Sequence, residues 1–213
     1  MLVIEPWDAK ARGDAKTVSH VVSGGLDHLP LEGEDLGMAV EELLWDMDGT
    51  LLDTTVVVPA AFVRTVHRLG GRSVDAAEVV AAYWRGTPEV ILEHLVGRQL
   101  ATDETDIYYQ ELESAEPDVY PGVREVFEVL HTQGRVRSVF TGASTRAASM
   151  LLRSAGLRAD LVIGGDQIQH PKPAPDGILL AADKLGTDAT QLAYVGDSPL
   201  DLQAASCVVP GRW

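Results

Sequence analysis

The segment LLWDMDGTLLD at residues 43–53 decides the fold expected for this chain. A short apolar run is followed by two carboxylates, Asp46 and Asp48, and then at once by Gly-Thr. Short apolar runs that end in turn residues are typical of buried strands, and residues two apart in an extended segment point to the same side. The pattern therefore predicts a strand that carries Asp46 and Asp48 into one pocket at its end.

Repulsion between two carboxylates held so close favours a divalent cation shared between them. Oxygen ligands from few side chains suit Mg²⁺, which keeps several waters and takes its other contacts from phosphate. One aspartate could then attack phosphorus, while the second protonates the leaving oxygen and later activates water. The alternative for the same residues is a plain polar turn, because Asp and Gly are abundant in turns.

The segment LAYVGDSPLD at residues 192–201 repeats this design of apolar strand, glycine and acids. Asp197 lies at the expected strand end and could bind Mg²⁺ directly or through water. Asp201 lies four residues on, at the start of a helix, where an acid also interacts favourably with the helix dipole or caps the helix. A supporting role at the site and plain helix capping are therefore both open for Asp201.

Two further segments could bind an anion. In VFTGAS at residues 139–144 an apolar strand runs into Thr141 and Gly142, whose hydroxyl and N–H can both donate to a phosphate oxygen just before a helix begins. Lys172 lies in HPKPAP at residues 170–175, where three prolines restrict the backbone. A lone loop lysine is usually just solvated, but an acid-rich phosphate pocket needs a positive group.

In order and spacing these segments resemble the motifs of the haloacid dehalogenase superfamily, and most closely its phosphoglycolate phosphatase-like branch with a helical cap. The matching residues are DMDGTLLD at 46–53, Thr141, KPAPD at 172–176 and GDSPLD at 196–201. The resemblance implies Asp46 as nucleophile, Asp48 as general acid and base, Thr141 as phosphate donor and Lys172 as the cation that steadies nucleophile and phosphate. It also implies Mg²⁺ held by Asp46, the Asp48 carbonyl and Asp197.

The alternation of strands and helices predicts an α/β fold, with a Rossmann-like parallel sheet flanked by helices and an inserted all-helical cap. We expect strands at 42–45, 136–140, 161–163 and 191–195, so that all the motifs lie at the carboxyl ends of strands, where such sheets bind ligands. The catalytic core is expected at 38–53 and 121–213. The cap is expected at 54–120, where apolar residues recur at helical spacing.

One cap helix is well marked, with Thr87 as N-cap, Pro88 at the first position and Gly97 just past the end. The segment from Arg85 to Pro88 resembles the substrate-specificity loop of the cap. Arg85 and Thr87 are therefore candidate substrate-binding residues, and Arg85 could reach a carboxylate or a second phosphate. The alternative for Arg85 is an ordinary exposed arginine beside Trp84.

The 213-residue chain has a net charge of −15 and 46% hydrophobic residues, which fits one α/β domain with a small insert. The acidic charge without a basic stripe argues against a nucleic-acid partner. No apolar stretch reaches membrane-span length, and no secretory signal is evident. Because Cys207 is the single cysteine, no internal disulfide can form, and a reducing cytoplasm is the simplest setting. The oligomeric state stays open.

Both ends depart from the family pattern. Residues 1–37 lack a clear apolar period, so we expect a loosely ordered extension that is dispensable for chemistry. At the other end, the helix that begins near Asp201 is followed too soon by Val208-Val209, which leaves room for a short edge strand or none. Such a shortened end could loosen the loop that holds Asp197.

These residues predict Mg²⁺-dependent hydrolysis of a small-molecule phosphomonoester through a phosphoaspartate at Asp46. Because Asp48 is present, the resemblance favours phosphoryl transfer over carbon–halogen cleavage. One alternative is a sugar-phosphate mutase similar to β-phosphoglucomutase, since the same motifs serve both reactions. Another is a non-catalytic protein that binds a phosphorylated metabolite, which the shortened C-terminus favours.

Overall fold

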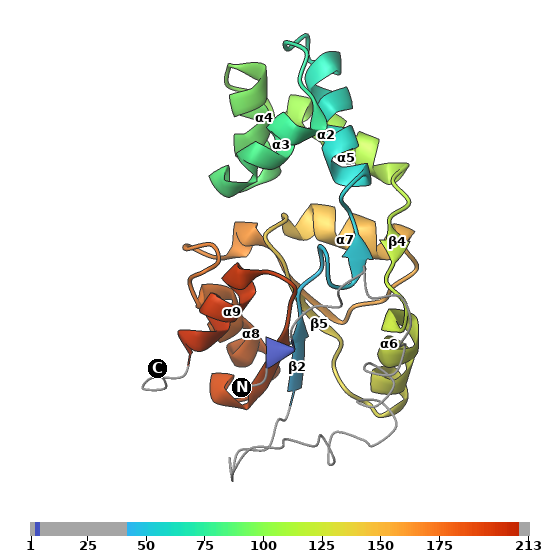
Figure 1. Ribbon diagram of the computed structural model, residues 1–213, viewed down its shortest axis with the longest axis vertical. Helices are drawn as coiled ribbons and strands as arrows, with labels where there is room; N and C mark the ends of the chain where they lie inside the picture. Colours follow the sequence, from blue (N-terminus) through green and yellow to red (C-terminus); the bar gives the residue numbers. More distant parts are fainter. Residues whose placement is uncertain (1–2, 5–41, 209–213) are drawn as a thin grey trace.

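The computed structural model describes residues 3–4 and 42–208. In this part of the chain a parallel sheet with flanking helices forms one lobe, and a group of helices forms a second lobe at the far end of the long axis (Figure 1). The sheet contains, in spatial order, β1 (Val3–Ile4), β7 (Leu192–Val195), β2 (Glu42–Trp45), β5 (Ser138–Phe140) and β6 (Leu161–Ile163), and each neighbouring pair is parallel. The carboxyl end of β2 therefore lies between those of β7 and β5.

Helices cover both faces of this sheet. They are α6 (Val123–Thr132), α7 (Thr145–Ser154), α8 (Asp176–Leu185) and α9 (Pro199–Ser206), with the single-turn helices η3 (Gly165–Gln167) and η4 (Ala189–Gln191). Leu43 of β2 packs with Val126 of α6, whereas the next residue, Leu44, packs with Ile178 of α8 and Ala204 of α9. Because successive strand residues point to opposite faces, the apolar β2 is buried between two layers of helices.

The second lobe is all helical. It consists of α2 (Val57–Arg68), α3 (Ala76–Ala82), the short helix η2 (Tyr83–Arg85), α4 (Pro88–Val96) and α5 (Thr102–Glu113). Phe62 and Tyr108 are buried in it, with ring centroids 4.4 Å apart. The chain passes between the lobes through β3 (Leu52–Asp53) and β4 (Asp118–Val119), which pair antiparallel. A hydrogen bond of 3.0 Å between the Tyr109 and Ser144 hydroxyls also joins α5 to the start of α7.

The structure confirms the predicted α/β class and the parallel sheet. Two strands begin one or two residues later than expected, at Ser138 and Leu192. Helix α4 has the predicted ends, and Gly97 takes the left-handed conformation, with φ of +83°, that ends the helix at little steric cost. Helices α2 to α5 all fall within the range 54–120, although the domain boundaries themselves stay a prediction. No helix among the described residues is long and apolar enough to span a bilayer.

Within residues 1–37, expected to be a loosely ordered extension, Val3–Ile4 form a strand that the sequence pattern did not indicate. These two residues form β1 and pair in parallel with Tyr194 and Val195 of β7. Two residues are too few to produce a recognisable alternation, so the pattern gave no signal. Residues 5–37 lie outside the described residues. Of the possible edge strand at Val208-Val209, Val208 lies in a turn and Val209 lies outside the described residues.

Candidate active site

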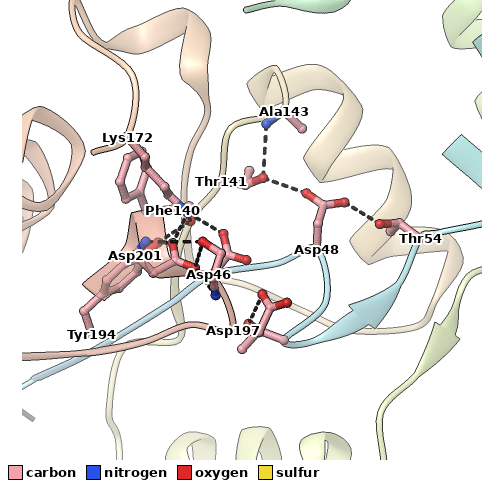
Figure 2. A network of polar contacts seen from close by, with 12 residues as sticks. Asp46, Asp48, Thr54, Phe140, Thr141, Ala143, Lys172, Tyr194, Asp197 and Asp201 are labelled. Carbon is pink, nitrogen blue, oxygen red and sulfur yellow. Dashed lines mark hydrogen bonds and ion pairs between the residues drawn. The ribbon is translucent and has the colours of Figure 1, made fainter. Parts of the chain in front are cut away.

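Asp46 is the first residue after β2, and its N–H donates to the carbonyl of Val195 at 2.8 Å. The residue is only 5% exposed, and Lys172 Nζ donates to Asp46 Oδ1 at 2.5 Å (Figure 2). Burial raises the pKa of Asp46 to about 7, and the charge of Lys172 opposes this rise. A further positive charge beside Asp46 would therefore favour its ionised form.

Asp48 is held by two hydroxyl groups rather than by a cation. Thr54 Oγ1 donates to Asp48 Oδ1 at 2.7 Å, and Thr141 Oγ1 donates to Asp48 Oδ2 at 2.9 Å. The Thr141 hydroxyl also accepts from the Ala143 N–H at 3.1 Å. The hydroxyl expected to donate to phosphate is thus turned toward Asp48 in this structure (Figure 2).

Three carboxylates meet where β2 and β7 end. Ligand oxygens of Asp46, Asp197 and Asp201 all lie within 4.8 Å of one another. Asp197 reaches this position because a glycine stands opposite it, since a Cβ at Gly49, whose φ is +82°, would lie 2.3 Å from Asp197 Oδ2. Oxygen donors gathered in this way fit a hard cation such as Mg²⁺. The structure thus brings together the predicted ligands Asp46 and Asp197 and adds Asp201.

Asp201 differs from the other two acids because both of its carboxylate oxygens accept from several donors of the protein. Its Oδ1 accepts from Lys172 Nζ at 2.7 Å and from the Tyr194 hydroxyl at 3.0 Å. Its Oδ2 accepts from the Ser198 hydroxyl at 2.6 Å and the Ser198 N–H at 3.0 Å. An ionised carboxylate offers about four acceptor positions, so a cation could bind Asp201 only by displacing one of these donors. Asp46 and Asp197 are therefore the better candidates for ligands.

These contacts show that Asp201 caps a helix and also lies beside Lys172, and its supporting role at the site stays a prediction. With Ser198 it forms the capping box of α9, and with Asp46 it encloses the ammonium of Lys172. Burial alone would raise the pKa of Asp201, but the charge of Lys172 and the hydrogen bonds lower it overall. Burial alone would lower the pKa of Lys172, but the charges of Asp46 and Asp201 raise it overall. Lys172 and Asp201 are therefore held in their charged forms, whereas burial still raises the pKa of Asp46.

The backbone around Gly142 forms the remaining part of the predicted anion site. Within the described residues no group accepts a hydrogen bond from the Gly142 N–H. Two residues later the Ser144 hydroxyl accepts from the Ala147 N–H at 3.2 Å and caps α7. An unengaged N–H beside a helix N-terminus favours an anion at this place.

The predicted cap residues are not joined to the aspartates of the core. Within the described part of the chain, no hydrogen bond or ion pair links Arg85 or Thr87 to them. The Arg85 guanidinium lies over the Trp84 ring, 4.7 Å from its centroid, and Trp84 is 75% exposed. The Thr87 side chain makes no capping hydrogen bond, although Thr87 precedes α4 as expected. Their roles in substrate binding stay a prediction.

Two residues near the site were not predicted from the sequence. One is Thr54, whose hydroxyl holds Asp48 and whose signal was only a threonine directly after the first motif. The other is Tyr83, a cap residue whose pKa is raised by burial and further by the negative charge of Asp48. This electrostatic link between a cap residue and a core acid has no local sequence pattern.

An acidic site at the carboxyl ends of parallel strands, beneath a helical insert, defines an α/β enzyme that handles a charged ligand. The chain belongs to the haloacid dehalogenase-like hydrolase family, whose model matches residues 43–208.

Individual relatives agree with this membership. Over 190 residues the chain is 35% identical to the protein named "Probable phosphatase IndB" of Dickeya dadantii (strain 3937), and the match covers 80% of each chain. Over 170 residues it is 31% identical to a phosphoglycolate phosphatase of Xanthomonas campestris pv. campestris (strain 8004), covering 76% of this chain and 77% of the relative. The structure of CbbY from Rhodobacter sphaeroides in complex with phosphate has the same fold, with a TM-score of 0.67 at 22% identity over 79% of this chain and 83% of that one.

Proposed function

We propose that the protein is a phosphatase that hydrolyses a small cytoplasmic phosphomonoester through a phosphoaspartate at Asp46. The observation that carries this proposal is the contrast between two adjacent carboxylates. Asp46 is buried and held by the Lys172 ammonium, whereas Asp48 is held by two hydroxyls. This contrast supports Asp46 as the nucleophile and Asp48 as the proton carrier. Relatives named as phosphatases support the same reaction.

In the first step an Asp46 oxygen forms a bond to phosphorus as the bond to the substrate oxygen breaks. Asp48 donates its proton to that leaving oxygen, so an alcohol departs. In the second step Asp48 takes a proton from water, and the resulting hydroxide attacks phosphorus and releases Asp46 and inorganic phosphate. A protonated Asp48 keeps acceptor positions for the Thr54 and Thr141 hydroxyls, so its own O–H is free to point to the leaving oxygen.

The phosphoryl group would be held by this chain's own donors. Lys172, the Gly142 N–H and the N-terminus of α7 supply positive ends toward the transferred oxygens. Mg²⁺ bound by Asp46, the Asp48 carbonyl and Asp197 would supply the remaining charge neutralisation. Because the net charge is −15, attraction of the phosphate has to come from these local groups.

The cap would close over the substrate and exclude bulk water. Arg85 and Thr87 are proposed to contact the part of the substrate that does not react, and Arg85 suits a carboxylate or a second phosphate. The single cysteine supports the cytoplasmic setting. The mutase alternative shares every core residue named here, and analysis of the products formed from a hexose phosphate separates the two reactions.

The proposal is tested by phosphate release from a panel of small phosphoesters, with and without Mg²⁺. Asp46→Asn is compared with the wild type, and Asp103→Asn, which changes an exposed aspartate of α5, is the matched control. Turnover that needs both Mg²⁺ and Asp46 is expected. Folded wild-type protein that binds phosphoesters with Mg²⁺ and turns none over would instead support a binding protein.

A further inference from the structure

Tyr194 of β7 lies fully buried beside the charged groups of the site. Its hydroxyl donates to Asp201 Oδ1 at 3.0 Å and lies 3.3 Å from the Phe140 carbonyl oxygen. A tyrosine hydroxyl has one hydrogen, and the charged and closer Asp201 oxygen is the stronger acceptor. The Tyr194 hydroxyl therefore donates its hydrogen bond to the Asp201 carboxylate.

The ammonium of Lys172 shares both of these acceptors. Lys172 Nζ donates to Asp201 Oδ1 at 2.7 Å and lies 3.4 Å from the Phe140 carbonyl oxygen. The same nitrogen lies 4.7 Å from the centroid of the Phe140 ring and 5.2 Å from that of the Tyr194 ring. Figure 2 shows Phe140, Tyr194, Asp201 and Asp46 gathered around this one ammonium.

These contacts bear on the direction in which the Lys172 ammonium points. Lysine carries a compact charge on a flexible four-carbon stem, so burial alone does not decide where the ammonium points. The ring faces attract a cation at these distances, and Asp201 Oδ1 gives the ammonium a definite partner. That partner is itself held in place from its far side by the Tyr194 hydroxyl.

Without the Tyr194 hydroxyl, Asp201 would have a second way to satisfy Oδ1. One Asp201 carboxylate oxygen lies within 4.8 Å of ligand oxygens of Asp46 and Asp197, where a cation would also attract this carboxylate. The Tyr194 hydroxyl opposes such a turn because it supplies a hydrogen bond only on the lysine side.

We infer that Tyr194 is a positioning residue, whose hydroxyl commits Asp201 to Lys172 and thereby directs the lysine ammonium onto Asp46. The assignment of a catalytic use to this lysine rests on the proposed function. The geometric part, that the hydroxyl sets the position of the ammonium, does not.

The first test is structural and needs no substrate. Crystal structures of the wild type and of Tyr194→Phe are compared, because phenylalanine keeps the ring and removes the hydroxyl alone. The contact between Lys172 Nζ and Asp201 Oδ1 is expected to be lost or clearly lengthened in the variant. Ser198→Ala is the matched control, since it removes a donor from Asp201 Oδ2, whereas Lys172 contacts Oδ1.

The second test is a double-mutant cycle on the binding of inorganic phosphate, measured by calorimetry with Mg²⁺ present. Tyr194→Phe is expected to weaken binding roughly ten-fold, as for the loss of one buried hydrogen bond to a charged group. In a Lys172→Met background the same change should have almost no effect, because the hydroxyl acts through the lysine. Tyr120→Phe, at the end of the β4 strand, should bind phosphate as the wild type does.

An unmoved ammonium in Tyr194→Phe would overturn the inference, as would equal phosphate losses in the two backgrounds. A variant that fails to fold would also overturn it, because one buried hydrogen bond is a small share of a domain's stability. A wild type that binds no phosphate contradicts the proposed function instead. The crystal structures would still decide the position of the lysine.

Discussion

The charged groups of the site in the sheet lobe are buried, whereas the arginines of the helical lobe are largely exposed. In the sheet lobe, Asp46, Lys172 and Asp201 are buried and hold one another through contacts of 2.5 and 2.7 Å. In the helical lobe, Arg85 stacks on Trp84, which is 75% exposed, and pairs with no acid among the described residues. Buried networks tolerate little change, whereas exposed groups can be replaced at small cost. The comparison suggests that the sheet lobe determines the reaction and the helical lobe determines the substrate.

The largest effect is expected where the buried network loses its cation. Lys172→Met leaves Asp46 and Asp201 facing each other without a positive charge, and we expect kcat to fall by roughly a thousand-fold. Lys184→Met, at the end of α8, is the matched control and should keep normal turnover. The measurement is steady-state phosphate release at saturating Mg²⁺. A loss below about ten-fold would mean that the network does not serve the chemistry.

The network also depends on tight packing behind it. A Cβ at Gly177 would lie 2.2 Å from atoms of the Phe140 ring, the ring that faces Lys172. Gly177→Ala should therefore destabilise the protein by about 1–3 kcal/mol through overpacking and should also lower kcat. Urea unfolding measures the first effect. Ala181→Gly, in the same helix, serves as the comparison. Gly186→Ala is less suitable, because the positive φ of Gly186 would add backbone strain to any effect of overpacking.

The pH dependence of stability tests the buried charges of the sheet lobe without any substrate. The pKa of Asp46 is raised from 3.8 to about 7 by burial, so the folded protein binds this proton more tightly than the unfolded chain does. The contribution of Asp46 to the free energy of unfolding is therefore fully present below pH 3.8 and decreases as pH rises through about 7.

In metal-free buffer the wild type should thus lose stability relative to Asp46→Asn as pH rises from 3.8 to about 7, the unfolded and folded pKa values of Asp46. Added Mg²⁺ should reverse the difference, because a bound cation favours the ionised carboxylate. Thermal unfolding of both proteins with EDTA and with Mg²⁺ is the measurement. Parallel curves at all pH values would contradict the raised pKa.

A smaller and different effect is expected in the cap. Arg85→Ala should raise KM by about ten-fold for a substrate that carries a second anionic group, with kcat little changed, because the contact would be made equally in ground and transition states. The melting temperature should stay within about one degree, since the side chain has no buried partner. Arg72→Ala, elsewhere on the cap surface, is the control. An unchanged KM for every anionic substrate would remove Arg85 from the site.

The smallest effect is expected at the N-terminal segment. Removal of residues 1–37 deletes β1 and exposes the edge of β7, and a two-residue pairing contributes only about 1 kcal/mol or less. We expect a slightly lower melting temperature and a kcat within about two-fold of the wild type. Loss of folded protein or of turnover would show that β1 supports the loop that carries Asp197.

The sequence predicted the sheet lobe far better than its connections. Asp46 and Lys172 each follow a local pattern at a strand end or in a proline-rich loop, and parallel strands bring such ends together. Thr54 and Tyr194 contact acids of the site that are close in space but distant from any local signature in the sequence. Tyr194 in particular reads as an ordinary strand residue, and only the geometry shows its hydroxyl on Asp201. Pairing of β1 was missed for a related reason, because backbone hydrogen bonds leave no trace in side-chain periodicity.

The antiparallel pair β3 and β4 has a practical consequence for protein engineering. The chain leaves the sheet lobe at Asp53 and returns at Asp118, and these two residues are directly paired. An insert whose two ends lie side by side can be exchanged without changing the connections of its host. The stretch between them is therefore a natural cassette, and a helical insert from a relative could be grafted there to retarget the same catalytic residues to another metabolite.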